Sequence, residues 1–212
     1  MSERITIIFL NGKLPTHRII SKFLKNNPYI ICADGGANKI KKFKIVPDII
    51  LGDLDSIKKD TKAYFTKKKT VIMKIDEQDT TDFEKCLLHC TENDLRNIFI
   101  FGAISSRPDH TLNNFSILKR YYKVLQLKII DDKFEIFFIN NSIEFDYKIG
   151  KVISLLAFPI AKRINTTGLK YPLDNEDLEF GVREGTLNSS ESEKIKINFS
   201  EGDLLLFKKH FL

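Results

Sequence analysis

The chain has 212 residues, of which 42% are hydrophobic and 29% charged, with 10 glycines and 6 prolines. This balance excludes an intrinsically disordered, collagen-like or low-complexity protein. The longest apolar runs, at 5–10 and 152–161, are shorter than the roughly 20 residues of a membrane-spanning helix, so we expect no membrane association. The N-terminal residues do not resemble a signal peptide, and the three cysteines form no C-x-x-C pair. A cytoplasmic protein is therefore expected.

The net charge of +6 is unevenly distributed. Residues 1–130 carry 23 basic and 14 acidic side chains, whereas residues 131–212 carry 11 and 14. A basic first part is typical of a protein that binds an anion, such as a polyphosphate or a nucleic acid. A lysine-rich composition explains the same charge equally well. The chain lacks tryptophan and any recognised alternation of aromatic and basic residues, so we expect no nucleic-acid partner.

Residues 1–132 alternate between short β-branched runs and amphipathic stretches. Strands are predicted at 5–10, 29–33, 49–51, 70–74, 97–101 and 127–130, and helices at 16–26, 37–43, 58–66, 81–90 and 112–123. This alternation predicts an α/β domain with a mostly parallel sheet flanked by helices. In the last helix, one face is predicted to carry Leu112, Phe115, Leu118 and Tyr122.

The pattern changes after residue 132. Short runs at 135–139, 143–147, 152–157, 178–182, 194–199 and 203–208 alternate with turn residues, and no strong helical period returns. This pattern predicts a small all-β sandwich domain over 133–212.

Acidic, mostly glycine-containing loops follow four predicted strands of the first domain, at 34–38, 52–56, 76–82 and 102–110. If the strands are parallel, these loops meet at one edge of the sheet, where α/β proteins bind ligands. Each loop alone has a structural explanation. Gly35 and Gly36 can form a turn, Thr81 can cap a helix with Glu84 reaching back, and Asp109 can cap the next helix.

Together, the loops indicate a magnesium–nucleotide site. Several carboxylates at one edge repel each other, and a hard cation offsets that repulsion. Glycines allow backbone N–H groups to approach phosphate, and Arg107 can bind phosphate oxygens with two donors. A metal site at Cys86, His89 and Cys90 is not expected, because the spacing does not suit tetrahedral zinc.

Five sequence strings resemble the thiamine pyrophosphokinase family in order and spacing: ADGGAN at 33–38, GDLDS at 52–56, QDTTD at 78–82, RPDHTLNN at 107–114 and TTGLKYPL at 166–173. The resemblance implies an ATP-binding catalytic domain over 1–132 and a thiamine-binding β-sandwich over 133–212. It also implies transfer of a diphosphoryl group from ATP to the thiamine hydroxyl, giving thiamine diphosphate and AMP. A homodimer is implied, with thiamine bound between the catalytic domain of one subunit and the β domain of the other.

The resemblance also implies roles for individual residues. We expect Mg²⁺ to be bound by Asp53, Asp55 and Asp82. The catalytic set is completed by Asp34, Arg107 and Asp109. ATP contacts are expected from Gly35, Gly36, Asn38, Gln78, Asp79, Thr81, His110 and Asn113, and thiamine contacts from Thr167, Tyr171 and Asn188.

The chain departs from the family pattern at two places. Ser105 and Ser106 replace the usual glycines, and a positive φ would be costly for a serine. Leu187 stands where a serine usually precedes the asparagine. Two other functions remain open: another magnesium-dependent nucleotidyl or phosphoryl transferase, which would not explain the 166–173 string, and a non-catalytic nucleotide-binding module.

Overall fold

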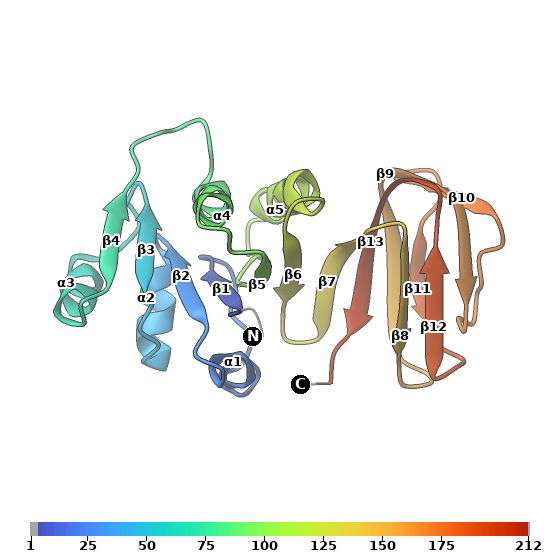
Figure 1. Cartoon of the computed structure of the whole chain (residues 1–212), viewed down its shortest axis with the longest axis horizontal. Coiled ribbons are helices and arrows are strands. Elements are labelled where there is room, and N and C mark those ends of the chain that lie inside the picture. The colour runs from blue at the N-terminus through green and yellow to red at the C-terminus, as the bar shows by residue number, and fades with distance from the viewer. Residues whose placement is uncertain (1–3, 212) are drawn as a thin grey trace. The chain divides into compact units, whose positions relative to one another are not determined.

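In a computed structural model, which describes residues 4–211, the chain divides after Asp132 into two compact units (Figure 1). We call residues 4–132 the α/β unit and residues 133–211 the β unit. None of the helices within 4–211 combines the length and the apolar composition that crossing a bilayer requires.

The α/β unit contains a parallel sheet with the strand order β4-β3-β2-β1-β5-β6. The strands are β1 (Thr6–Phe9), β2 (Tyr29–Ala33), β3 (Ile49–Gly52), β4 (Val71–Lys74), β5 (Asn97–Phe101) and β6 (Gln126–Ile130). The central strands are buried on both faces, which is why they read as continuous apolar runs such as Thr6–Phe9. The predicted mostly parallel α/β sheet is confirmed.

Helices connect these strands: α1 (His17–Leu24), α2 (Gly36–Ile40) with a 3₁₀ turn at Lys41–Phe43, α3 (Lys59–Lys67), α4 (Asp82–Glu92) and α5 (Pro108–Tyr121). Helix α4 packs on β2 and β3 and contacts α5 (Figure 1). An apolar core joins strand residues such as Ile7 and Phe9 to Ile20 of α1 and Phe65 of α3. Alternate residues of one strand thus serve different faces of the sheet.

Helix α5 begins four residues before the predicted start, with Pro108 in its first turn. Proline suits this position because the first helical N–H groups have no intrahelical acceptor. The predicted apolar face is wrong at Leu112, which is 56% exposed, whereas Ile117 and Leu118 are fully buried. Leu112 lies between His110 and Asn113, which line the cavity described below, and the buried residues of α5 lie further along the helix.

The β unit consists of antiparallel strands: β7 (Phe134–Ile139), β8 (Ser142–Asp146), β9 (Val152–Thr167), β10 (Glu176–Glu179), β11 (Gly185–Ser189), β12 (Lys194–Asn198) and β13 (Glu201–Lys209). Strand β9 belongs to two sheets. It pairs with β13, β10 and β11 over most of its length, and residues 165–167 pair with β12, which also pairs with β8. Apolar residues from both sheets, including Leu204, Ile195 and Ile197, form one core.

Strand β9 is ten residues longer than the predicted strand 152–157. Pro159 argues against a central strand, but the register with β13 shifts there: Gly202 pairs with Ala161, and Leu204 pairs with Ala157. Between these two pairs, β9 has more residues than β13, and the resulting bulge in β9 accommodates Pro159. Strand β11 was not predicted, because it also contains a register shift and its Leu187 side chain is 86% exposed.

Candidate active site

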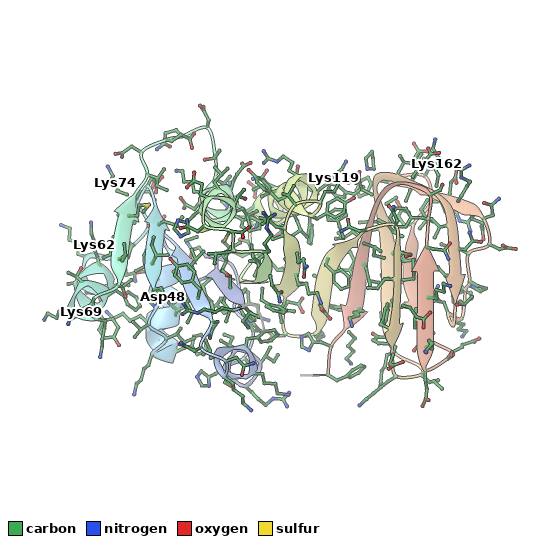
Figure 2. The ribbon with its side chains drawn as sticks, in the orientation of Figure 1. Asp48, Lys62, Lys69, Lys74, Lys119 and Lys162 are labelled. Carbon is green, nitrogen blue, oxygen red and sulfur yellow. The ribbon has the colours of Figure 1, made fainter. Side chains whose placement is uncertain are left out.

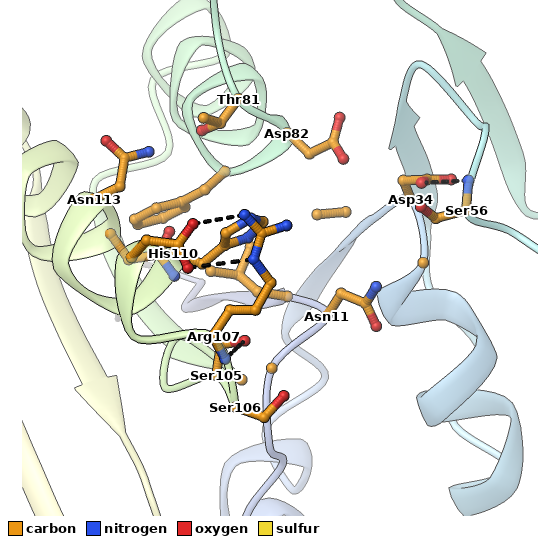
Figure 3. A pocket seen from close by; sticks show the side chains of 18 residues that line it. Asn11, Asp34, Ser56, Thr81, Asp82, Ser105, Ser106, Arg107, His110 and Asn113 are labelled. Atoms are coloured by element: carbon orange, nitrogen blue, oxygen red, sulfur yellow. Dashed lines mark hydrogen bonds and ion pairs between the residues drawn. The ribbon is translucent and has the colours of Figure 1, made fainter.

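A cavity of about 790 Å³ opens at the carboxyl edge of the parallel sheet (Figure 3). The loops after β1, β2, β3 and β5 line it, together with the first turns of α4 and α5. Its lining side chains and backbone belong to Leu10, Asn11, Gly12, Ala33, Asp34, Gly35, Ser56, Thr81, Asp82, Phe83, Gly102, Ser105, Ser106, Arg107, Asp109, His110, Asn113 and Asn114.

The strand order explains the position of this cavity. After β1 the chain runs toward β2, whereas after β5 it runs toward β6 on the other side. Such a reversal between neighbouring parallel strands opens a crevice beyond their carboxyl ends. Backbone hydrogen bonds join the loop after β1 to the end of β5 and the residue after it, and so stabilise the base of the crevice. They run from Leu10 N to Phe101 O at 2.8 Å and from Gly12 N to Gly102 O at 2.8 Å.

Sequence reasoning missed Asn11 and Gly12, which line this crevice after β1. The rule that found the other loops, namely that ligands meet the residues after each strand, applies equally to the first strand. Phe83 and Asn114 also line the cavity without having been predicted. Asn114 donates to Ala103 O at 2.7 Å, so it also stabilises the loop after β5.

Three carboxylates meet at the acidic side of the cavity. Asp34, Asp53 and Asp82 each place one carboxylate oxygen within 4.8 Å of the other two. We call these three residues the acidic group. Gly52 permits this approach: its φ is +144°, and a Cβ there would lie 2.7 Å from Oδ1 of Asp82. A larger residue at the end of β3 would therefore be strained and would push the carboxylates apart.

Asp34 is 1% exposed and connects two loops. Its oxygens accept hydrogen bonds from Ser56 N at 2.9 Å, shown in Figure 3, and from Ile57 N at 3.0 Å. Burial raises the pKa of the Asp34 carboxyl above its ordinary value, and these two N–H groups oppose that rise. Asp34 thus holds the loop after β3 beside the loop after β2, in addition to its place in the acidic group.

Asp82 begins α4 and lies on the same side of the cavity as Asp34 (Figure 3). Burial raises the pKa of its carboxyl to about 6, with further contributions from the negative charges of Asp34 and Asp53. Ionising all three carboxylates of the acidic group at once therefore costs free energy. Three oxygen ligands in this arrangement suit a hard divalent cation, which would relieve the repulsion.

Asp55, a predicted metal ligand, lies outside this group and is exposed. Its carboxylate accepts a hydrogen bond from Ser56 Oγ at 2.8 Å, and its N–H donates to Asp53 Oδ1 at 3.3 Å. These two hydrogen bonds stabilise the loop after β3, which carries Asp53.

The predicted nucleotide contacts fall into two groups. Gly35, Thr81, His110 and Asn113 line the cavity, and Thr81 Oγ1 also caps α4 by accepting from Glu84 N at 3.3 Å. The others lie outside its lining. Gly36 packs against the backbone of β1, Asn38 bridges Ser56 O and Lys58 N, and Gln78 and Asp79 lie in the exposed loop after β4.

Arg107 lines the cavity and pairs with Asp109 through two contacts, 3.2 Å from Nε to Oδ1 and 2.6 Å from Nη2 to Oδ2 (Figure 3). Asp109 therefore orients the guanidinium and does not cap α5, whose N-cap is Arg107. Ser105 and Ser106 are not among the residues with positive φ, so the loop accommodates serine without that strain. Instead, Ser105 Oγ accepts a hydrogen bond from Arg107 N at 3.2 Å.

In the β unit, the predicted thiamine residues lie on β9, on β11 and on the loop between β9 and β10. Asn188 is 7% exposed and holds the backbone of Tyr171, accepting from its N at 3.0 Å and donating to its O at 2.6 Å. The Tyr171 side chain is 61% exposed, and Thr167 is also exposed. Asn188 thus fixes a loop that presents an aromatic ring to solvent.

These features define an α/β protein with an acidic ligand cavity at the carboxyl edge of its parallel sheet, followed by a β-sandwich unit. Comparison with known families gives two matches that together cover most of the chain. Residues 20–130 match the catalytic domain of thiamin pyrophosphokinase, and residues 140–204 match its vitamin B1 binding domain.

Individual relatives agree with these matches. Thiamine pyrophosphokinase 1 of Arabidopsis thaliana is 31% identical, over 95% of this chain and 85% of the plant protein. The corresponding protein of Oryza sativa subsp. japonica is 28% identical, over 96% and 86%. The crystal structure of thiamine pyrophosphokinase from Bacillus subtilis has the same fold, with a TM-score of 0.85, 24% identity and coverage of 98% of this chain and 100% of the other. The chain belongs to the thiamine pyrophosphokinase family.

Proposed function

We propose that this chain is an enzyme that transfers a diphosphoryl group from ATP to the hydroxyl group of thiamine, forming thiamine diphosphate and AMP. Membership of the family carries this proposal, since both the catalytic and the vitamin B1 binding domains are matched. The cavity supports it, because an acidic group and an arginine face each other across a space large enough for a nucleotide.

Mg²⁺ is the proposed metal, held by Asp34, Asp53 and Asp82. Opposite ligands of Mg²⁺ are about 4.2 Å apart, given bonds of about 2.1 Å, so oxygens within 4.8 Å of one another suit this ion, directly or through water. Bound there, Mg²⁺ would neutralise negative charge on the phosphates of ATP. Asp55 is assigned a supporting role, through the loop that carries Asp53.

The remaining cavity residues are proposed to bind and orient the triphosphate. Arg107 offers two N–H donors to phosphate oxygens, and Asp109 holds its guanidinium in place. The N-terminus of α5 adds a partial positive charge beside His110 and Asn113. These groups stabilise the charge that develops on the phosphates when the bond to AMP breaks.

Thiamine binding is assigned to the β unit, and the active form to a homodimer. Tyr171 offers an exposed ring for stacking, on a loop that Asn188 fixes. Exposed apolar side chains in the β unit support a protein interface: Leu187 is 86% exposed, Val182 74% and Phe180 53%. Sedimentation of the intact chain over a range of concentrations tests the dimer.

We also propose a cytoplasmic location. The three cysteines are free and buried. Unpaired thiols are typical of proteins in a reducing compartment. Cell fractionation with an antibody against the chain tests this assignment.

The decisive experiment incubates the purified protein with ATP, Mg²⁺ and thiamine and separates the nucleotides and thiamine species. We expect AMP and thiamine diphosphate in equal amounts, and no AMP when thiamine is left out. ADP or free pyrophosphate as the main product would instead indicate another type of transferase. Binding of ATP without any turnover would indicate a nucleotide-binding module.

A further inference from the structure

Lys85, in the first turn of α4, is a buried cation behind the acidic group. Its side chain is only 4% exposed, which is rare for a lysine because an ammonium group loses its hydration on burial. It does not line the cavity. A lysine in this position therefore needs an electrostatic or structural reason.

Within residues 4–211, the polar contacts of the Lys85 ammonium group are few. Its Nζ donates one hydrogen bond, to Ile75 O at 3.3 Å, and lies 4.0 Å from Oδ1 of Asp82. The ammonium has three N–H donors, and one 3.3 Å hydrogen bond is weak compensation for its burial. The main compensation is therefore the negative charge beside it, which comes from the acidic group.

The charge of Lys85 acts on Asp82 and on a carboxylate of the loop after β4. It opposes the rise in the pKa of Asp82 and helps to lower the pKa of Glu77 in the loop after β4. Through Ile75 it is also attached to the start of that loop. Lys85 thus connects α4, the acidic group and the loop after β4.

We propose that Lys85 is a positioning residue and a permanent counter-charge of the acidic group, which weakens cation binding and strengthens binding of the nucleotide anion. This inference rests on the proposed function. A fixed positive charge behind Asp82 keeps the metal-free site closer to neutrality. It also lowers the affinity for the cation, since like charges repel across a poorly hydrated region. The same charge attracts ATP.

The test uses Lys85→Gln, which keeps a donor for Ile75 O and removes the charge, and Lys85→Met, which keeps the apolar stem. Lys85→Arg retains the charge. Lys62→Met is the matched control, because Lys62 is an exposed lysine on α3 (Figure 2). Thermal unfolding of each variant comes first. Binding of Mn²⁺ without nucleotide, and of ATP in the presence of a chelator, is then measured by calorimetry at pH 8.

We expect Lys85→Gln to bind Mn²⁺ roughly three- to tenfold more tightly and ATP roughly three- to tenfold more weakly. Lys85→Arg and Lys62→Met should resemble the wild type. These opposite changes distinguish a charge effect from a loss of structure, which would weaken both ligands. Weakening of both, or no change in either, overturns the inference while leaving the proposed function intact. A wild-type chain that binds neither Mn²⁺ nor ATP would overturn both.

Discussion

The acidic group combines residues that are individually unfavourable. Asp34 has a φ of 29° and Leu54 a φ of 63°, both in the left-handed region that most side chains avoid. Three carboxylates share the same small space, and Gly52 is required at its edge. Strain and repulsion of this kind are typical of sites whose geometry serves a ligand.

Asp53 and Asp55 have the same chemistry but different positions, so substitution separates their roles. We expect Asp53→Asn to reduce turnover by about 100-fold or more, because it removes a carboxylate from the acidic group. Asp55→Asn should reduce it much less. Both variants should keep the wild-type unfolding temperature, because the loop that carries both residues lies at the edge of the sheet. Equal losses of activity would place Asp55 at the metal.

The pKa of Asp82 predicts how pH affects stability and metal binding. It is raised from 3.8 to about 6 in the folded chain, so the folded state binds more protons than the unfolded state between these values. Stability of the metal-free protein should therefore fall as pH rises from about 4 to about 6, with no further contribution from Asp82 above that.

Mg²⁺ binds the ionised form of the Asp82 carboxylate. The stabilisation that Mg²⁺ gives should therefore increase as pH rises. We expect Mg²⁺ to raise the unfolding temperature more at pH 7.5 than at pH 5, as measured by calorimetry with and without the ion. In Asp82→Asn, the metal-free protein should be more stable at pH 7.5 and should respond less to Mg²⁺. A variant less stable than the wild type would contradict this account.

Helix α4 is joined to α5 by a buried carboxylate. The sequence allows a capping box in which Glu84 reaches back toward Thr81, but the carboxylate of Glu84 instead contacts Arg120 at 2.8 Å and Tyr121 Oη at 3.0 Å. Only the Thr81 half of the capping box forms. Tertiary partners compete successfully for Glu84, because its carboxylate is only 7% exposed.

This junction connects the helix that carries Asp82 to the helix that follows Arg107. We expect Tyr121→Phe to lower the free energy of unfolding by about 1 kcal/mol and Glu84→Ala to lower it by about 2–3 kcal/mol, because the latter removes the acceptor of two side chains. Denaturant unfolding measures both. Arg96→Ala is the control, since Arg96 pairs with the exposed Asp94. If Glu84→Ala costs no more than the control, the junction is not important for stability.

The elements of the α/β unit were largely predictable, because long apolar runs and helical periods coincide there with turn residues. Strand order was not predictable, since it depends on contacts between distant residues. Asn11 and Gly12 were missed for another reason: the rule that ligands meet the residues after each strand was not applied to the first strand. In the β unit, the alternation of apolar and polar residues predicts only the first part of β9, because a bulge follows at Pro159, and it does not predict β11, which contains the exposed Leu187. The acidic side of the site could be anticipated because each loop directly follows its strand.

The proposed function divides the two substrates between the two units. The cavity proposed to bind ATP is lined by residues of the α/β unit, whereas Tyr171 and Asn188 lie in the β unit, where Asn188 fixes the Tyr171 backbone. Substitutions in one unit should therefore affect mainly one substrate.

We expect Asn188→Ala to raise KM for thiamine by about tenfold with little change in KM for ATP, because two hydrogen bonds that fix the Tyr171 loop are lost. Arg107→Ala should raise KM for ATP and lower kcat, with a smaller effect on KM for thiamine. Steady-state kinetics with each substrate varied in turn measures these effects. Parallel changes in both KM values for Asn188→Ala would contradict the division.

The strand order also has a consequence for synthesis on the ribosome. Strand β1 lies between β2 and β5, but β5 is made only at residues 97–101. At roughly 5–20 residues per second, one edge of β1 stays unpaired for several seconds while its apolar residues await a partner. The cavity can form only after β5 joins the sheet, because the loops after β1 and β5 both line it.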